Sequence, residues 1–230
     1  MSAEIPTREA LLDAALGHVA FDGWSEATIA AAVEDLGISA DQARALCPRG
    51  ALDLAVAYHR RGDEAMRANL GAADLDAMRV RERVTFAVRA RVEAAGDREV
   101  VRRGTTFFAQ PRNTGEGARL IWGTADAIWD ALGDPSDDIN WYSKRAILSG
   151  VYSATVLFWL GDESPDREAT WRFLDRRIGD VMNFEKLKGQ LRENPLTKGI
   201  FAGAEGLLSR IKAPSRTRRD DLPGRWTGDT

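Results

Sequence analysis

The sequence predicts an all-α protein, and three observations support this fold class. Apolar residues recur three and four positions apart along most of the chain, and no segment alternates polar and apolar residues convincingly as a strand would. Glycine- and proline-containing segments separate these periodic blocks. Serine or threonine stands directly before several blocks, in the position of a helix N-cap. The length of 230 residues suits one or two domains with a substantial core.

Three short helices are expected at the N-terminus. Thr7 and Ser25 can cap the first two, because their side-chain oxygens can accept a bond from free backbone N–H groups. A turn follows at residues 36–39, and Ser39 can cap a third helix that ends before Pro48. Longer helices are expected after this unit, over residues 49–70, 79–95, 98–109, 116–132, 140–160 and 167–191.

Composition limits the cellular compartments in which the protein is expected. The net charge is −3 and Cys47 is the single cysteine, so a reducing compartment fits and no intrachain disulfide is possible. The first residues carry neither a basic region nor an apolar core, so we expect no targeting peptide and a cytoplasmic protein. The longest apolar run, residues 146–160, is shorter than the roughly 20 residues of a membrane span and predicts a buried helix.

Catalytic motifs are missing from the sequence. Neither His18 nor His59 belongs to a Glu-x-x-His pair, and no nucleophile elbow, phosphate loop or dinucleotide-binding motif occurs. Helix capping and solvated loops account better than acid–base chemistry for the acidic pairs at residues 137–138 and 162–163. We expect a protein that is not an enzyme and carries no metal and no cofactor, although a helical enzyme acting on an isoprenoid stays open.

Aromatic residues gather in the C-terminal half of the chain. Helical bundles hold apolar ligands between their helices, and aromatic side chains commonly line such sites. A simple aromatic core would account for most of these residues one by one, so both interpretations stay open. The candidate lipid-binding residues are Trp122, Trp129, Tyr152, Phe158 and Trp159.

A strongly amphipathic segment covers residues 195–212. At about 100° per residue its apolar side chains fall on one face, and three glycines weaken the helix. The apolar face could meet the protein core, a partner or a membrane surface. Arginines at 216, 218 and 219 would attract anionic lipid and favour the membrane. The candidate membrane-binding residues are Leu196, Ile200, Phe201, Leu207, Leu208 and Ile211.

The N-terminal pattern resembles the helix-turn-helix of tetracycline-repressor-like (TetR) regulators. The resemblance covers residues 7–60 and rests on the turn at 36–39 and the Cys-Pro-Arg-Gly-Ala-Leu segment at 47–52. It implies a small three-helix unit followed by a larger helical ligand-binding domain. DNA binding draws most of its affinity from cations on phosphates. Residues 1–60 carry four arginines and nine acidic residues, a net charge of −5, which argues against DNA binding.

A second resemblance covers residues 118–182 densely. The segments that carry it are Asp-Asp-Ile-Asn-Trp-Tyr-Ser-Lys-Arg-Ala-Ile-Leu at 137–148, Val-Tyr-Ser-Ala-Thr at 151–155, Asp-Glu-Ser-Pro-Asp at 162–166 and Thr-Trp-Arg-Phe-Leu-Asp-Arg-Arg-Ile at 170–178. They resemble the lipid-binding accessory family of ubiquinone biosynthesis, the ninth coenzyme Q biosynthesis protein.

This second resemblance implies a DNA-inactive homodimer that binds polyprenylated quinone intermediates and presents them to a membrane-associated enzyme, the demethoxyubiquinone hydroxylase or its equivalent. It implies a membrane-docking C-terminal helix, and hence a protein peripheral on the inner membrane. It also implies a partner-binding surface whose candidate residues are Asn140, Trp141, Tyr142, Lys144 and Arg145. Because Trp141 and Tyr142 are neighbours, they cannot share one core-facing stripe, and one of them can be exposed.

The expected domains follow from these patterns. They are a helix-turn-helix-like unit at residues 1–48, a helical lipid-binding domain at 49–191, an amphipathic membrane helix at 192–213 and a disordered tail at 214–230. The expected function is non-catalytic lipid binding in ubiquinone biosynthesis. A TetR-like transcriptional regulator with an apolar ligand is the alternative.

Overall fold

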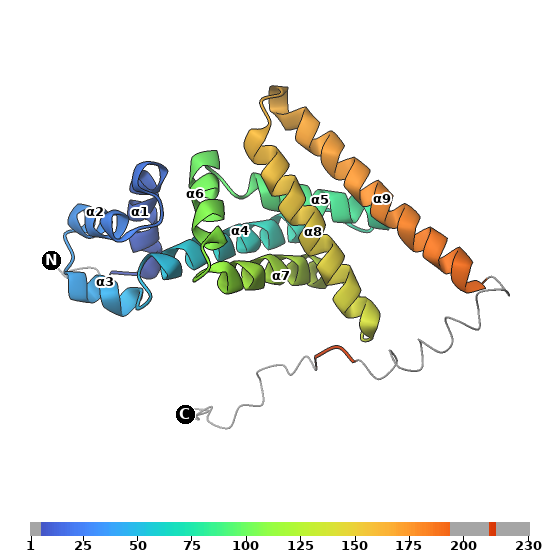
Figure 1. Ribbon diagram of the computed structural model, residues 1–230, viewed down its shortest axis with the longest axis horizontal. Helices are drawn as coiled ribbons and strands as arrows, with labels where there is room; N and C mark the ends of the chain where they lie inside the picture. Colours follow the sequence, from blue (N-terminus) through green and yellow to red (C-terminus); the bar gives the residue numbers. More distant parts are fainter. Residues whose placement is uncertain (1–5, 194–211, 215–230) are drawn as a thin grey trace, which may run out of the picture.

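Helices make up every regular element of the described chain, which agrees with the all-α prediction (Figure 1). The structure is a computed structural model, and it describes residues 6–193 and 212–214. A small N-terminal group of helices lies at one end of the molecule, and the remaining helices form a larger body beside it (Figure 1).

The N-terminal unit consists of α1 (Arg8–Asp22), α2 (Glu26–Leu36) and α3 (Ala40–Leu46). The three predicted N-caps are confirmed, since the side-chain oxygens of Thr7, Ser25 and Ser39 each accept a backbone N–H from the first turn that follows. Gly37 ends α2 at a φ of 61°, in the left-handed region that glycine adopts without strain.

Within residues 6–193, the larger body contains six long helices and one short 3₁₀ turn. In Figure 1, α8 and α9 pass across the group formed by α4, α5 and α7, while α6 stands nearest to the N-terminal unit. The predicted ranges agree with the observed ones to within a few residues. The observed elements are α4 (Ala51–Ala72), α5 (Val80–Glu93), α6 (Arg98–Ala109), α7 (Thr114–Ala131), α8 (Ile139–Gly161), η1 (Pro165–Arg167) and α9 (Glu168–Glu193).

Two hydrophobic clusters stabilise the described chain. The first is built from the end of α4 together with α5, α7, α8 and α9, and it includes buried Met66, Ile128 and Leu174. The second joins α1–α3 to the start of α4 and also contains Val100 and Phe107 of α6. Because α6 contributes to the N-terminal cluster, the N-terminal unit is packed onto the larger body rather than separated from it by a linker.

The C-terminal predictions fall on residues that the structure does not describe. The candidate membrane-binding residues Leu196, Ile200, Phe201, Leu207, Leu208 and Ile211 lie outside the described ranges, as does the expected tail apart from residue 214. Within the described ranges, no helix is both long and apolar enough to cross a bilayer. Domain limits at 48 and 191 stay predictions.

Candidate functional site

A largely apolar cavity of about 380 Å³ lies between the helices of the larger body, next to the N-terminal unit. Residues from α4, α5, α6, α7 and α8 line it, and Trp24 of the α1–α2 connection completes the wall. Thr105 and Ala109 of α6 and Leu157 of α8 line the cavity and are exposed, so it reaches the surface between these two helices. The volume is within the range of about 300–1,000 Å³ that is common for small-molecule sites.

Two of the five aromatic residues expected to bind lipid line the cavity. Tyr152 and Trp159 are buried on α8 and line it. The other three are not among the lining residues. Trp122 packs beside Trp141, with ring centroids 6.0 Å apart, and the Lys144 ammonium lies 5.3 Å from the Trp129 ring. Phe158 is partly exposed and stacks on Phe173 of α9, with ring centroids 4.6 Å apart.

Apolar residues of earlier helices supply much of the remaining wall. Phe108 of α6, Ile121 of α7 and Val156 of α8 are among the apolar lining residues. The predicted lipid-binding residues are all C-terminal aromatics, so they did not include these positions. Trp24 was also missed, because a single tryptophan in a short loop gives no periodic signal.

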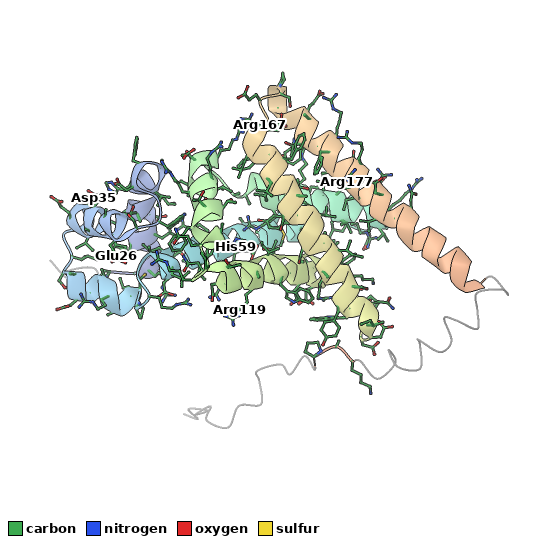
Figure 2. The ribbon with its side chains drawn as sticks, in the orientation of Figure 1. Glu26, Asp35, His59, Arg119, Arg167 and Arg177 are labelled. Carbon is green, nitrogen blue, oxygen red and sulfur yellow. The ribbon has the colours of Figure 1, made fainter. Side chains whose placement is uncertain are left out.

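A polar network forms one part of the cavity wall, where α4 lies against α7. Figure 2 labels one of its members, His59. His59 Nε2 lies 2.8 Å from Thr124 Oγ1, and the Thr124 hydroxyl donates to Asp63 at 2.8 Å. The Arg91 guanidinium, 3% exposed, donates through Nε to Asp63 at 2.6 Å and through Nη2 to the carbonyl of His59. Gly62 makes room for it, because a Cβ there would lie 2.6 Å from Arg91 Nη1.

Burial shifts the pKa of two residues that line the cavity, His59 and Tyr58. Burial, together with the neighbouring Arg91 cation, lowers the pKa of His59 to about 4, so its imidazole is neutral near pH 7. Burial also raises the pKa of Tyr58, another lining residue, to about 12. Among the described residues, no group of three or more His, Cys, Asp or Glu side chains could hold a metal ion. The polar wall therefore offers hydrogen bonds that are already paired within the protein.

The predicted partner surface lies at the start of α8. Asp138 caps this helix, as expected for one of the acidic pairs, by accepting the backbone N–H of Asn140. Trp141 is buried and packs edge-to-face on Tyr142, which is partly exposed, with ring centroids 4.8 Å apart. Of these two neighbouring aromatic residues, one therefore faces the core and the other reaches the surface.

The two cations of this surface have different positions. Lys144 is partly exposed and lies 2.6 Å from Asp134, whereas Arg145 is completely buried and contacts Asp126 at 2.5 Å and Asp134 at 3.2 Å. The Arg145 guanidinium also lies 4.0 Å from the centre of the Trp141 ring. Burial alone would raise the pKa of Asp134, but the hydrogen bonds from Lys144, Ser136 and Arg145 and the charge of Lys144 together outweigh it and lower that pKa below its usual range. Arg145 therefore supports the surface from beneath.

Residues 212–214 contact the same surface. The backbone N–H of Ala213 donates to the carbonyl of Asp137 at 2.8 Å, and the Tyr142 hydroxyl lies 3.3 Å from the carbonyl of Lys212. Residues 212–214, where the amphipathic segment ends, thus lie beside the start of α8 and contact the candidate partner residue Tyr142.

Comparison with solved structures supports the TetR-like fold. The structure is similar to a TetR transcriptional regulator from Nitrosomonas europaea with a TM-score of 0.63 and 21% identity, over 75% of this chain and 95% of that one. This likeness shows the fold alone. The short α3 helix carries one arginine, Arg44, which is paired at 3.0 Å with Asp41.

Comparison with known sequences gives a family match over the helices that carry much of the candidate site. The family model described as COQ9 matches residues 114–185, from α7 to α9. The mitochondrial ubiquinone biosynthesis protein COQ9 of Rattus norvegicus is 38% identical over 104 residues, which are 44% of this chain and 33% of that protein. The chain thus matches about a third of the length of its mammalian relatives.

A fungal relative extends the match to nearly the whole chain. The mitochondrial ubiquinone biosynthesis protein coq9 of Schizosaccharomyces pombe is 30% identical over 211 residues, which are 90% of this chain and 79% of that protein. The mitochondrial protein from Dictyostelium discoideum, described as a probable ubiquinone biosynthesis protein, is 27% identical over 88% of this chain and 66% of its own length. This chain therefore belongs to the COQ9 family.

Proposed function

We propose that this protein has a non-catalytic role in ubiquinone biosynthesis and binds a polyprenylated quinone intermediate or a related isoprenoid lipid in the cavity. The observation that carries the proposal is the apolar cavity of about 380 Å³ that opens between α6 and α8. Its lining is built from side chains such as Val156, Ile121 and Phe108, which suit an isoprenoid chain. The membership of the COQ9 family supports the same biosynthetic role.

The polar wall supports binding rather than catalysis. A general base must be free to take a proton from a substrate, at a pKa close to the working pH. His59 has a pKa lowered to about 4 by burial and Arg91, and its Nε2 already faces Thr124. Asp63 is bound by Arg91 and Thr124. These groups stabilise the wall and leave the chemistry to a partner enzyme.

We propose that the partner is the membrane-associated demethoxyubiquinone hydroxylase or an equivalent enzyme, which binds at the start of α8. The partly exposed ring of Tyr142, beside Asn140 and Lys144, gives this surface an aromatic anchor with polar neighbours. Residues 195–211 would dock on the cytoplasmic face of the inner membrane through their apolar stripe. The contacts of residues 212–214 with α8 would keep that stripe close to the partner surface.

We also propose a homodimer that uses the exposed apolar side chains of α8 beside α9. Leu157 is 59% exposed and Phe158 is 38% exposed, and Phe158 stacks on Phe173. A second copy could cover these side chains. Light scattering coupled to size-exclusion chromatography is expected to give twice the chain mass, and a monomer at micromolar concentration would contradict the dimer.

Lipid content tests the central proposal. The full chain, purified without detergent, is expected to carry an isoprenoid quinone or a related isoprenoid lipid that mass spectrometry of the extract identifies. Thr105→Trp places a large ring on the cavity lining at its opening, so it should remove most of this lipid. A chain that retains no isoprenoid, or a Thr105→Trp variant that retains as much as the natural chain, would contradict the proposal.

A neighbouring threonine supplies the matched control. Thr106 is also exposed on α6 and also donates its hydroxyl to the carbonyl four residues earlier, but it does not line the cavity. Thr106→Trp therefore adds the same ring to the same helix, and the bound lipid is expected to stay at the level of the natural chain.

A further inference from the structure

The indole of Trp24 presents a hydrogen-bond donor without an acceptor at the cavity wall. Trp24 stands between α1 and α2, is 5% exposed and lines the cavity. Its Nε1 has no hydrogen-bond partner within the described part of the chain. Buried indole N–H groups usually find an acceptor, because an unpaired one loses its hydration without compensation. A bound molecule with an acceptor atom would supply what the protein does not.

The neighbouring helix leaves space for such an acceptor. Gly104 lies within α6, where glycine is less favourable than alanine. A Cβ at this position would lie 3.5 Å from Trp24 Nε1, with no other heavy atom outside the local backbone within 4 Å. The missing side chain therefore leaves open the volume next to the indole nitrogen.

Two other polar groups of the cavity wall, those of Tyr58 and Arg91, are already paired within the protein. The Tyr58 ring lies 5.6 Å from the Trp24 ring between centroids, and the Tyr58 hydroxyl donates to the carbonyl of Ala95. The Arg91 guanidinium is bound to Asp63 and to the carbonyl of His59, so it is not free to neutralise an anionic ligand. A neutral acceptor, such as a carbonyl or ether oxygen, suits a neutral donor in a largely apolar cavity.

We infer that the Trp24 indole N–H donates a hydrogen bond to an uncharged oxygen on the ring of the bound lipid, and that Trp24 thereby selects oxygenated prenyl rings over plain hydrocarbons. This inference rests on the proposed lipid-binding function and adds a specificity-determining residue to it. It also gives the N-terminal unit a part in ligand binding, since Trp24 belongs to the hydrophobic cluster of that unit.

The test compares two probes with the same tail. One is a dimethoxy-methyl-benzoquinone carrying two isoprene units, and the other is benzene carrying the same two units. Equilibrium dialysis against the full-length, delipidated protein measures the dissociation constant of each. Trp24→Phe keeps an aromatic ring but removes the donor, so it should weaken quinone binding roughly five- to tenfold and leave hydrocarbon binding unchanged.

Two further variants separate the hydrogen bond from a folding defect. Gly104→Ala puts a methyl group beside the indole nitrogen while raising helix propensity, so it should weaken quinone binding without lowering the unfolding temperature. Trp122→Phe is the matched control, because Trp122 does not line the cavity, and both dissociation constants should stay unchanged.

The outcomes distinguish this inference from the proposed function. Unchanged quinone binding by Trp24→Phe and Gly104→Ala would overturn the role of the indole and leave lipid binding intact. An equal loss for both probes would show that Trp24 acts as a wall and would also overturn the hydrogen bond. A natural chain that binds neither probe would overturn the proposed function itself.

Discussion

Two arginines, Arg145 and Arg91, are buried in this protein for different purposes. Arg145 lies beneath the start of α8, completely buried between Asp126, Asp134 and the ring of Trp141. Arg91 lies on the wall of the cavity and is bound to Asp63 and to the carbonyl of His59. Each cation is paired, as burial of charge requires.

The difference lies in what each cluster faces. The Arg145 cluster joins α7, the α7–α8 connection and α8, and it holds a surface in place. The Arg91 cluster faces a cavity, so removing its cation also changes the polarity of the cavity wall. The Arg145 cluster therefore stabilises the position of a surface, whereas the Arg91 cluster also sets the polarity of the cavity. Variants of the two clusters should differ in their effects on stability and on bound lipid.

The largest loss of stability is expected for Arg145→Ala. The change removes the cation that bridges Asp126 and Asp134, and it leaves Asp134 with a side chain that is 1% exposed. Breaking a buried ion pair costs about 3–5 kcal/mol. Urea unfolding should show a free energy of unfolding lower by about 3 kcal/mol, because Asp134 keeps its contact with Lys144.

An exposed pair provides the control for that measurement. Arg44 and Asp41 form a salt bridge with side chains that are 74% and 91% exposed, so Arg44→Ala should change the free energy of unfolding by less than about 0.5 kcal/mol. A loss for Arg145→Ala as small as that of the control would show that the α8 cluster does not hold the surface.

The next largest effect is the pH dependence that His59 imposes. Its pKa is about 4 in the folded chain, lowered by burial and Arg91 from the ordinary histidine value of 6.5. Above pH 6.5 His59 is neutral in both states; as pH falls towards 4, the unfolded chain takes up the proton first and folding is disfavoured. The loss of free energy of unfolding that His59 causes reaches about 3 kcal/mol at low pH, because each unit of pKa difference is worth about 1.36 kcal/mol.

Comparison of variants isolates this contribution from that of the carboxylates. His59→Gln should flatten the decline of the free energy of unfolding between pH 6.5 and 4, measured by urea unfolding at a series of pH values. His18→Gln changes the other histidine, which is 32% exposed and pairs with Asp35, and the steep decline should persist. An equally steep decline in His59→Gln would show that another group carries the pH dependence.

Local signals made the helices predictable, whereas the site depends on contacts between distant segments. Thr7, Ser25 and Ser39 are capping residues that act within one turn, so the sequence shows them directly. Trp24 and Arg91 reach the cavity from parts of the chain 67 residues apart, and no periodicity records that approach.

Burial of individual charges was equally hard to predict. Lys144 and Arg145 are adjacent in the sequence and both carry a positive charge, yet Lys144 is partly exposed and Arg145 is completely buried. Arg145 can be buried because Asp134 and Asp126 lie around its side chain, and the packing of α7 against α8 brings them there. For Arg91, a signal was present: among the four arginines of α5 it stands four residues after Ala87 and three after Val88, which are both buried.

A smaller loss of stability, with an added effect on the ligand, is expected for Arg91→Met. Methionine keeps much of the volume but leaves Asp63 without its cation, which should lower the free energy of unfolding by about 2 kcal/mol because Asp63 keeps the hydrogen bond from Thr124. The unpaired carboxylate lies 3.9 Å from Nε2 of the lining residue His59 and makes the surroundings of the cavity more polar, so less lipid should co-purify per folded chain. Arg145→Ala should keep its lipid at any temperature where it is folded, and equal lipid loss in both variants would remove the distinction between the clusters.

The smallest effect on stability, and the sharpest on partner binding, is expected for Tyr142→Ala. The ring is partly exposed and packs edge-to-face on Trp141, so its removal should cost about 1 kcal/mol. If the start of α8 binds the hydroxylase, loss of an aromatic anchor should weaken that complex more than tenfold, as titration calorimetry can measure. Tyr142→Phe keeps the ring, loses the contact with the Lys212 carbonyl and should bind nearly as well as the natural chain. Equal affinity of Tyr142→Ala and the natural chain would move the partner surface away from α8, and the Arg145 cluster would then stabilise the fold without supporting an interface.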